Sequence, residues 1–165
     1  INMSEFANTI KDSLLEKFTK TSYELDGYGE HNFFMSQDEI HPAIEFLKNN
    51  GFIYLTDITG SHYPEKEGAE FQVVYHIHNL SENLRIRLKV DLSEKDVHVP
   101  SMTDLFAGAN WMERETFDFF GIIFEGHPNL TRILNVDDMD YHPMKKEYAL
   151  EDETRTDKDD TFFGR

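Results

Sequence analysis

Two neighbouring stretches, 71–78 and 84–90, constrain the fold of this 165-residue chain more than any other feature. In both, apolar side chains occupy every second position: Phe71, Val73, Tyr75 and Ile77 in the first, and Leu84, Ile86, Leu88 and Val90 in the second. A period of two is the pattern of a strand that packs one face on a core. Ser81-Glu82-Asn83, between them, is typical of a turn. The sequence therefore predicts a β-hairpin whose second face meets solvent or a partner.

Two amphipathic helices are predicted before this hairpin. From Met3 to Lys20, apolar residues recur at steps of three to five, which is the stripe of a helix with one apolar face. A second helix is predicted to begin after Ser36, because Glu39 three residues later completes a capping-box pattern. Asn50-Gly51 is expected to end that helix.

The remaining pattern predicts one more helix and several short strands. Residues 102–120 favour a helix that is interrupted near Gly108 and closed by Gly121 in a left-handed cap. Short strands are predicted at 32–35, 52–59 and 97–99. These elements predict an α+β fold, with a mostly antiparallel or mixed sheet and helices packed on one face.

The chain is predicted to divide into an α+β domain, residues 1–134, and an extended acidic tail, residues 135–165. Beyond Val136 apolar residues are few and acidic residues are frequent, among them Asp137, Asp138, Asp140, Glu151, Asp152, Glu153, Asp157, Asp159 and Asp160. Such a segment buries too little apolar surface to fold alone. We therefore expect partner subunits to order the tail.

Composition excludes several classes of function. The chain has no cysteine, so it can form no disulfide, thiolate zinc site or cysteine-ligated iron–sulfur cluster of its own. Its formal net charge of −16 disfavours binding to nucleic acid or to an anionic membrane surface. No apolar run reaches the roughly 20 residues of a membrane-spanning helix, and no signal-like segment opens the sequence. We therefore expect a cytoplasmic protein without membrane insertion.

Two histidines are the best candidates for chemistry within the chain. His76 and His78 are two residues apart in a predicted strand, so both imidazoles lie on the same face and could begin a metal site. The sequence indicates no third ligand. A metal-dependent hydrolase that uses these histidines with nearby carboxylates is one alternative interpretation.

The most informative stretch runs from Trp111 to Leu134. On a helix Arg114 and Asp118 lie four residues apart, and Glu115 lies three before Asp118, so charged groups crowd one side. Aromatic and β-branched residues follow at once: Phe117, Phe119, Phe120, Ile122, Ile123 and Phe124. The charges form either a solvated face or a cluster that fixes the geometry beside a packed region.

This stretch resembles the signature of the C subunit, the 30 kDa subunit family, of respiratory complex I (proton-translocating NADH:quinone oxidoreductase). The residues that match the signature are Asp104, Leu105, Ala109, Asn110, Trp111, Glu113, Arg114, Glu115, Asp118, Gly121, Phe124, Gly126, His127, Pro128, Leu130, Arg132, Ile133, Leu134, His142, Pro143 and Lys146. The chain departs from the family at Tyr141, where glycine is common, and at Lys145-Lys146-Glu147, where Arg-Lys-Asp is common. Ala149 replaces a usual proline. These departures concern the path of the tail.

The resemblance implies a non-catalytic scaffold subunit in the peripheral arm of that enzyme. It carries no cofactor itself; FMN, iron–sulfur clusters and quinone are expected in partner subunits. The expected partners are the D subunit, which helps form the quinone cavity, and the B and I subunits, on the cytoplasmic side of the bacterial inner membrane. In isolation, the uncovered aromatic surface would favour weak self-association. A second alternative is the equivalent subunit of a related membrane-bound hydrogenase or formate hydrogenlyase.

The resemblance also implies which residues bind the partner. They are Trp111, Glu113, Arg114, Glu115, Asp118, Gly121, Phe124, His127, Pro128, Arg132, His142, Pro143 and Lys146. The charged helix residues 114, 115 and 118 are expected to fix the turn at Gly121, which presents His127-Pro128 and Arg132 to the partner. Aromatic burial would supply most of the binding energy, and the charges would set the register.

Overall fold

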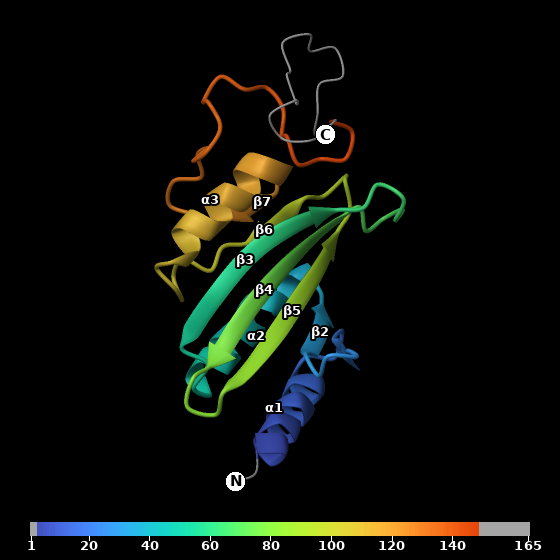
Figure 1. The fold of residues 1–165 in the computed structure, drawn as a ribbon, viewed down its shortest axis with the longest axis vertical. Coiled ribbons are helices and arrows are strands. Elements are labelled where there is room, and N and C mark those ends of the chain that lie inside the picture. The colour runs from blue at the N-terminus through green and yellow to red at the C-terminus, as the bar shows by residue number, and fades with distance from the viewer. Residues whose placement is uncertain (1–2, 149–165) are drawn as a thin grey trace, which may run out of the picture.

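Residues 3–148 are the part of the chain that the computed structural model describes, and they form three α-helices and seven β-strands (Figure 1). In chain order these are α1 (Met3–Lys17), β1 (Ser22–Leu25), β2 (His31–Met35), α2 (Gln37–Asn49), β3 (Tyr54–His62), β4 (Phe71–Asn79), β5 (Leu84–Leu92), β6 (His98–Pro100), α3 (Ala109–Phe120) and β7 (Ile123–Glu125). The α+β prediction is confirmed.

A mixed five-stranded sheet, in the order β1-β2-β5-β4-β3, forms the centre of the molecule. Strands β2 and β5 pair in parallel, and the other neighbours pair antiparallel. The predicted hairpin is confirmed as β4 and β5, which pair from Phe71↔Leu92 to Asn79↔Leu84. Its apolar positions are buried, as the alternation predicted. A separate parallel pair, β6 and β7, completes the strands.

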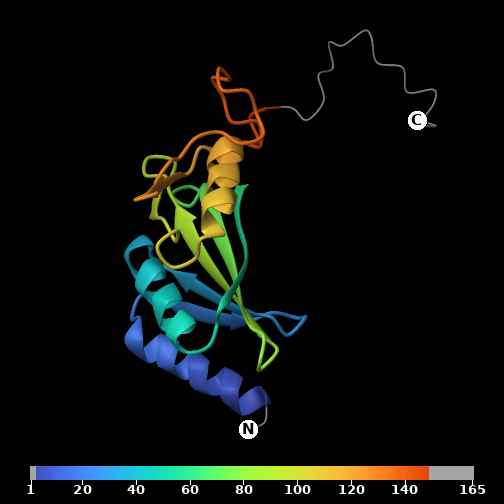
Figure 2. The same cartoon turned by 90° about the vertical axis from the view of Figure 1, so that its left-hand side faces the viewer.

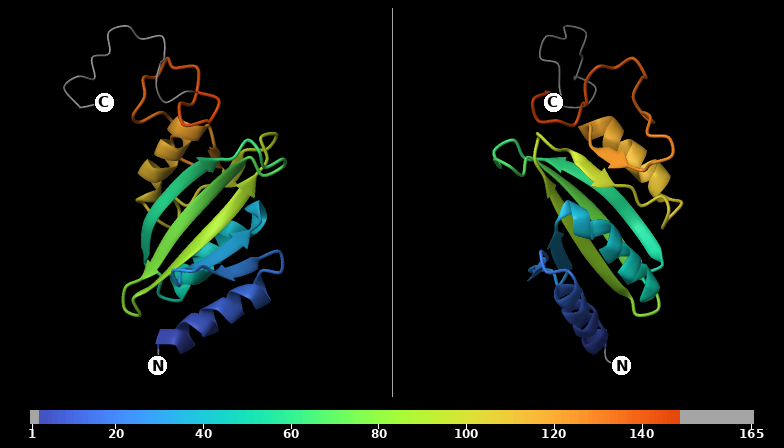
Figure 3. Two further views of the ribbon diagram at one scale, coloured as in Figure 1. Left: turned by 45° about the vertical axis from the view of Figure 1, so that its right-hand side comes forward. Right: turned by 180° about the vertical axis from the view of Figure 1, so that it is seen from behind.

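Two helices cover one face of the sheet. Figure 3 shows α2 across that face with α1 beside it. The apolar stripe of α2 is fully buried at Ile40, Ile44 and Leu47, and α1 buries Ile10 and Leu14. None of the helices in the described part of the chain is long and apolar enough to cross a membrane.

The capping-box pattern located the start of α2 but not its hydrogen bonds. Ser36 is the N-cap residue, yet its side chain makes no capping hydrogen bond. The Glu39 carboxylate instead accepts hydrogen bonds from the Lys20 N–H and the Thr21 hydroxyl, both at 3.3 Å. It therefore ties the start of α2 to the segment that follows α1.

Several element boundaries differ from the predictions. Helix α1 ends at Lys17, three residues earlier than the apolar stripe suggested, and β3 runs from Tyr54 to His62, rather than from 52 to 59. Residues 102–108 form turns, because the Met102 carbonyl accepts the N–H groups of Leu105 and Phe106. Strands β1 and β7 were not predicted; both are short and largely exposed.

The predicted division at residue 134 stays a prediction. Residues 135–148 contact α3 and β3 of the same chain through backbone and side-chain hydrogen bonds. That part of the tail therefore has partners inside the chain. The predictions made for the rest of the tail fall outside the described residues.

Helix α3 packs along β3, an edge strand of the sheet (Figure 2). The buried Thr116 hydroxyl donates a hydrogen bond to the Ile58 carbonyl at 3.2 Å, and so satisfies one backbone group of the sheet edge. Gly60 lets the helix approach closely. A Cβ atom at position 60 would lie 2.7 Å from Cδ2 of Phe120 and 3.1 Å from Cγ2 of Thr116.

This contact predicts that Gly60→Ala destabilises the chain. The added methyl group has no room against the Phe120 ring, so we expect the free energy of unfolding to fall by about 1–3 kcal/mol. Gly108→Ala is the matched control, because position 108 has no atom within 4 Å and a φ of −64°, and we expect a change within about 0.5 kcal/mol. Urea unfolding of both variants measures this; equal effects would contradict the close approach of α3.

Candidate functional site

The Asp118 carboxylate, at the end of α3, organises the segment that follows β7. It is completely buried, and it accepts a hydrogen bond from the Arg132 guanidinium at 2.7 Å. It also accepts three consecutive backbone N–H groups, those of Ile133 at 3.1 Å, Leu134 at 2.8 Å and Asn135 at 2.9 Å. The Asn135 side-chain amide donates a further bond. We call this set of five residues the Asp118 anchor.

Opposing effects set the pKa of Asp118. Burial by itself raises it, because the charged form loses its hydration. The N–H groups of Asn135 and Leu134 and the Arg132 guanidinium stabilise the carboxylate and together outweigh burial, so the pKa lies well below its usual value. The anchor therefore holds a charged carboxylate at any physiological pH.

The two arginines of the motif both bind within the chain. Arg114 donates to the carbonyls of Thr131 and Arg132, at 3.0 and 2.8 Å. The Arg132 guanidinium reaches beyond Asp118 to the carbonyls of Met139 and Tyr141. Arg114 and Asp118, four residues apart on α3, thus bind residues 131–135 with two separate side chains rather than forming an ion pair. We call residues 131–146 the strap. The side chain of Arg132 is only 10% exposed, and its predicted contact with a partner stays a prediction.

The strap continues over the C-terminal end of α3. His142 lies against Gly121, and its Nδ1 bonds the Asp118 carbonyl at 3.0 Å. Gly121 adopts the predicted left-handed conformation, with a φ of 77°, and a Cβ there would lie 2.7 Å from the His142 ring. Next along the strap, the Met144 N–H donates to the Phe119 carbonyl at 3.0 Å. These bonds satisfy carbonyls that a helix end leaves free.

A buried histidine, not predicted from sequence, ends the strap. The Lys146 N–H donates to Nδ1 of His62 at 2.9 Å, and the His62 ring stacks on Phe71 with centroids 4.4 Å apart. His62 closes β3, so this bond fastens the strap to the sheet as well as to α3. No local pattern marks His62, because its partner lies 84 residues away.

A second buried carboxylate joins α3 to the chain before it. Glu113 is fully buried and accepts the Ser101 hydroxyl and the Met102 N–H, both at 2.6 Å. Burial is the largest influence on its pKa and raises it from 4.5 to about 7, against the opposing effect of the two hydrogen bonds. Its charge adds to burial in raising the pKa of Tyr75, whose hydroxyl is buried and has no hydrogen-bond partner in the described part of the chain.

The other motif residues divide between packing and exposure. Phe124 is buried in the core, whereas Trp111 is 60% exposed and its ring lies 5.4 Å from the Arg114 guanidinium. His127 bonds the Asn110 carbonyl through Nε2. The structure leaves Glu115, Pro128 and Lys146 exposed, and half-buries Pro143.

The geometry does not support a metal site at the paired histidines. Both project from β4 on one face, as expected, but the Arg87 guanidinium donates to Nε2 of His76 at 2.9 Å. This bond occupies the nitrogen lone pair and places a positive charge where a cation would bind. Across residues 3–148, no three His, Asp or Glu side chains are grouped to hold a metal ion.

Residues 33–154 match the family described as "Respiratory-chain NADH dehydrogenase, 30 Kd subunit". Among curated proteins, the chain is 41% identical to the C subunit of NADH-quinone oxidoreductase from Nocardioides sp. over 125 residues, which are 74% of this chain and 50% of that protein. It is also 41% identical to a C subunit of NADH-quinone oxidoreductase from Rhizobium etli, over 73% of this chain and 61% of that protein. The chain thus spans about half the length of the curated relatives it matches.

Two solved structures share the fold. A trypsin-resistant fragment of Nqo5 superposes with a TM-score of 0.69 at 31% identity, over 76% of this chain and 99% of the fragment. A chain of the membrane-bound sulfane sulfur reductase, an archaeal respiratory membrane complex, superposes with a TM-score of 0.75 over 87% of this chain and 86% of that chain. At 23% identity, the second likeness concerns the fold alone.

The buried Glu113 predicts a pH-dependent stability. Its folded-state pKa of about 7 lies above its ordinary value of 4.5, so the folded chain holds this proton more tightly than the unfolded chain does. The proton on Glu113 therefore stabilises the folded chain fully below pH 4.5, and this stabilisation is lost as the pH rises to about 7. Glu113→Gln should remove this fall, which amounts to about 3 kcal/mol at most. Urea unfolding between pH 5 and 8 measures this fall in the free energy of unfolding.

The exposed Glu115→Gln is the control, and its free energy of unfolding should depend on pH as the wild type's does. The same pH dependence in Glu113→Gln would contradict the prediction.

Proposed function

The chain belongs to the family of the 30 kDa subunit of respiratory-chain NADH dehydrogenase, and from this membership we propose that it is a non-catalytic scaffold subunit of an NADH:quinone oxidoreductase. The observation that supports this role is the Asp118 anchor. Its buried charges bind backbone groups of the same chain, an arrangement suited to holding a surface in place and not to converting a substrate.

The surface held in this way is apolar. Around α3 and the strap, large apolar side chains are left open to solvent: Trp111 at 60%, Leu134 at 64%, Val136 at 63%, Met144 at 43% and Tyr141 at 38% exposure. We call these five residues the α3 apolar surface. Large apolar side chains that stay exposed on a hydrogen-bonded backbone are typical of a protein-binding site.

The hydrogen-bonded backbone beneath this surface favours binding to a partner. The backbone of Leu134 is fixed by Asp118, and that of Met144 by the Phe119 carbonyl, so the backbone loses little further freedom when a partner covers these side chains. Trp111 supplies the large aromatic group that often dominates binding energy. In this proposal the buried charges shape the surface and apolar burial supplies the affinity.

The proposed partners are the other subunits of the same enzyme. We propose that the D subunit, with the B and I subunits nearby, covers the α3 apolar surface on the cytoplasmic side of the inner membrane. FMN, iron–sulfur clusters and quinone would reside in partner subunits, where electrons pass from NADH to quinone and protons are translocated. The absence of cysteine from the sequence agrees with this division, because the chain offers no thiolate to a cluster.

A pull-down of the tagged chain from gently solubilised membranes tests the proposal. We expect subunits that bind quinone and iron–sulfur clusters to co-purify with NADH:quinone reductase activity. Recovery with hydrogenase subunits would assign the chain to a related machine instead, and recovery alone from the soluble fraction would contradict the scaffold role.

Surface variants make the test specific. Leu134→Lys places a charge on the α3 apolar surface without disturbing a buried side chain, so we expect it to weaken co-purification about tenfold or more while the chain stays folded. Glu65→Lys, in the exposed connection between β3 and β4, is the matched control and should co-purify like the wild type. Circular dichroism confirms folding of both; equal recovery of the two variants would show that Leu134 lies outside the interface.

A further inference from the structure

We propose that the chain has a second protein-binding surface, centred on Tyr28 at the tip of the β1–β2 hairpin, which binds a basic face of a neighbouring subunit that has an apolar socket for the tyrosine ring. This inference rests on the proposed function, because it takes the chain to be one subunit of a larger complex.

Tyr28 is displayed by a loop built to be rigid. Its side chain is 96% exposed. The Asp26 carboxylate accepts the N–H groups of Tyr28 and Glu30, both at 2.9 Å, and the Gly29 N–H donates to the Asp26 carbonyl at 3.0 Å. Gly29 has a φ of +81°, a conformation that favours glycine and lets the chain turn sharply. A fixed loop therefore projects a large aromatic side chain that packs against nothing in the described part of the chain.

A fixed, exposed tyrosine suits protein binding. Tyrosine offers a large apolar area and a hydroxyl with few rotatable bonds, so it binds at a small cost in conformational entropy. The loop adds little to that cost on binding because its backbone is already ordered. Leu25, 55% exposed, lies in the same hairpin, and Leu80, 57% exposed, lies in the β4–β5 turn.

The two turns lie at one end of the sheet. Strand β2 begins at His31, which pairs with Ile86 near the start of β5, so the loop before β2 and the turn before β5 are neighbours. Figure 2 shows both turns projecting to the same side of the molecule. Helix α3 lies toward the other end (Figure 1), so the Tyr28 surface is separate from the α3 apolar surface.

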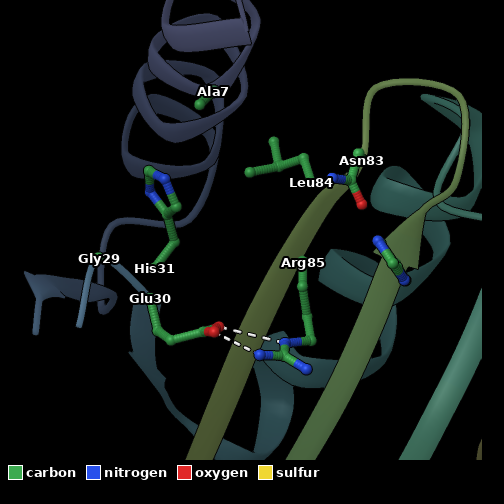
Figure 4. A pocket seen from close by; sticks show the side chains of 8 residues that line it. Ala7, Gly29, Glu30, His31, Asn83, Leu84 and Arg85 are labelled. Carbon is green, nitrogen blue, oxygen red and sulfur yellow. Dashed lines mark hydrogen bonds and ion pairs between the residues drawn. The ribbon is translucent and has the colours of Figure 1, made fainter.

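A hollow between the two turns gives the surface its shape. It has a volume of about 450 Å³ and is lined by residues of α1, the β1–β2 loop and the β4–β5 hairpin. Figure 4 shows Ala7 and Leu84 on its apolar side, and Glu30 paired with Arg85 on its polar side. Gly29 and Glu30, which follow Tyr28 in the chain, line the hollow. A partner that has a socket for the Tyr28 ring and a projection that enters the hollow would fit this surface.

The charged side chains near the hairpin tip indicate the kind of partner. The chain carries a net charge of −16, and the exposed Glu24 lies near the tip of the hairpin. The nearby Arg85 is already paired with Glu30, and Arg87 lies 3.6 Å from Asp26, so neither offers a free positive charge to an anion. A second copy of the chain would bring the same acidic side chains to this surface, so charge disfavours it as the partner here. A basic protein face fits these charges best.

The tip of the β1–β2 hairpin, with Tyr28, precedes the segment that matches the family. The family match covers residues 33–154, whereas the hairpin tip lies at 26–30. The α3 apolar surface lies inside the match. The family match therefore does not include Tyr28, although it includes the residues that the β4–β5 hairpin contributes to the hollow.

Photo-crosslinking from position 28 in the assembled complex tests the inference. The chain with p-benzoylphenylalanine in place of Tyr28 is expressed in its own host, irradiated in membranes and recovered by its tag; the same replacement at the exposed Glu65 is the control. We expect position 28, and not position 65, to crosslink to another subunit of the same complex, at a peptide that contains lysine or arginine.

The outcomes separate this inference from the proposed function. Retention of the chain in the complex without a crosslink from position 28, or with a crosslink only to a second copy, would overturn the Tyr28 surface alone. Failure of the chain to co-purify with any complex would overturn both.

Substitutions measure the contribution of the ring. Tyr28→Ala should raise the dissociation rate of the chain from the complex by about tenfold, the loss expected for an aromatic anchor, while Tyr28→Phe should stay near wild type. The side chain is exposed, so neither variant should unfold the chain. An unchanged dissociation rate in Tyr28→Ala would overturn the proposal.

Discussion

The buried carboxylate of Asp118 is the interaction on which the C-terminal half of this structure depends. A carboxylate without hydration is unfavourable in a protein interior unless hydrogen bonds and an opposite charge replace the water. Here three consecutive backbone N–H groups and Arg132 do so. The same bonds fix an irregular strap whose large apolar side chains, Leu134 and Val136 among them, stay exposed instead of packing in the core. The strap, in turn, covers the free carbonyls at the end of α3 and reaches the sheet at His62.

Sequence patterns predicted the elements whose signals are local. The alternation in 71–78 and 84–90 gave the β4–β5 hairpin, and Gly121 gave the left-handed end of α3. The spacing of Arg114 and Asp118 indicated a charged cluster but not its partners, because those are backbone groups 15 to 18 residues further along the chain and the Arg132 side chain 14 residues along. Glu113 was named from the motif, but its burial depends on a turn that the sequence suggested would be helical. Long-range contacts decided each of these outcomes, and a local pattern carries no information about them.

The positions of the exposed apolar side chains are consistent with the scaffold role proposed for this family member. The interior of the described chain is packed by its own side chains, with only the Ser36 and Tyr75 hydroxyls lacking a hydrogen-bond partner there. The two surfaces proposed for assembly, the α3 apolar surface and the Tyr28 hairpin, lie toward opposite ends of the sheet (Figure 1). Both present apolar side chains on backbone that hydrogen bonds hold in place. A protein with two such surfaces can set the distance between its neighbours, which is the work of a scaffold.

Amide hydrogen exchange at residues 133–135 tests the Asp118 anchor most directly. The structure predicts that these three amides, although they lie outside any helix or strand, exchange about as slowly as the interior amides of α3. In Asp118→Asn the three amides should lose this protection while the amides of β4 and β5 keep theirs. Exchange in the wild type as fast as in the exposed turn at 65–67 would contradict the account.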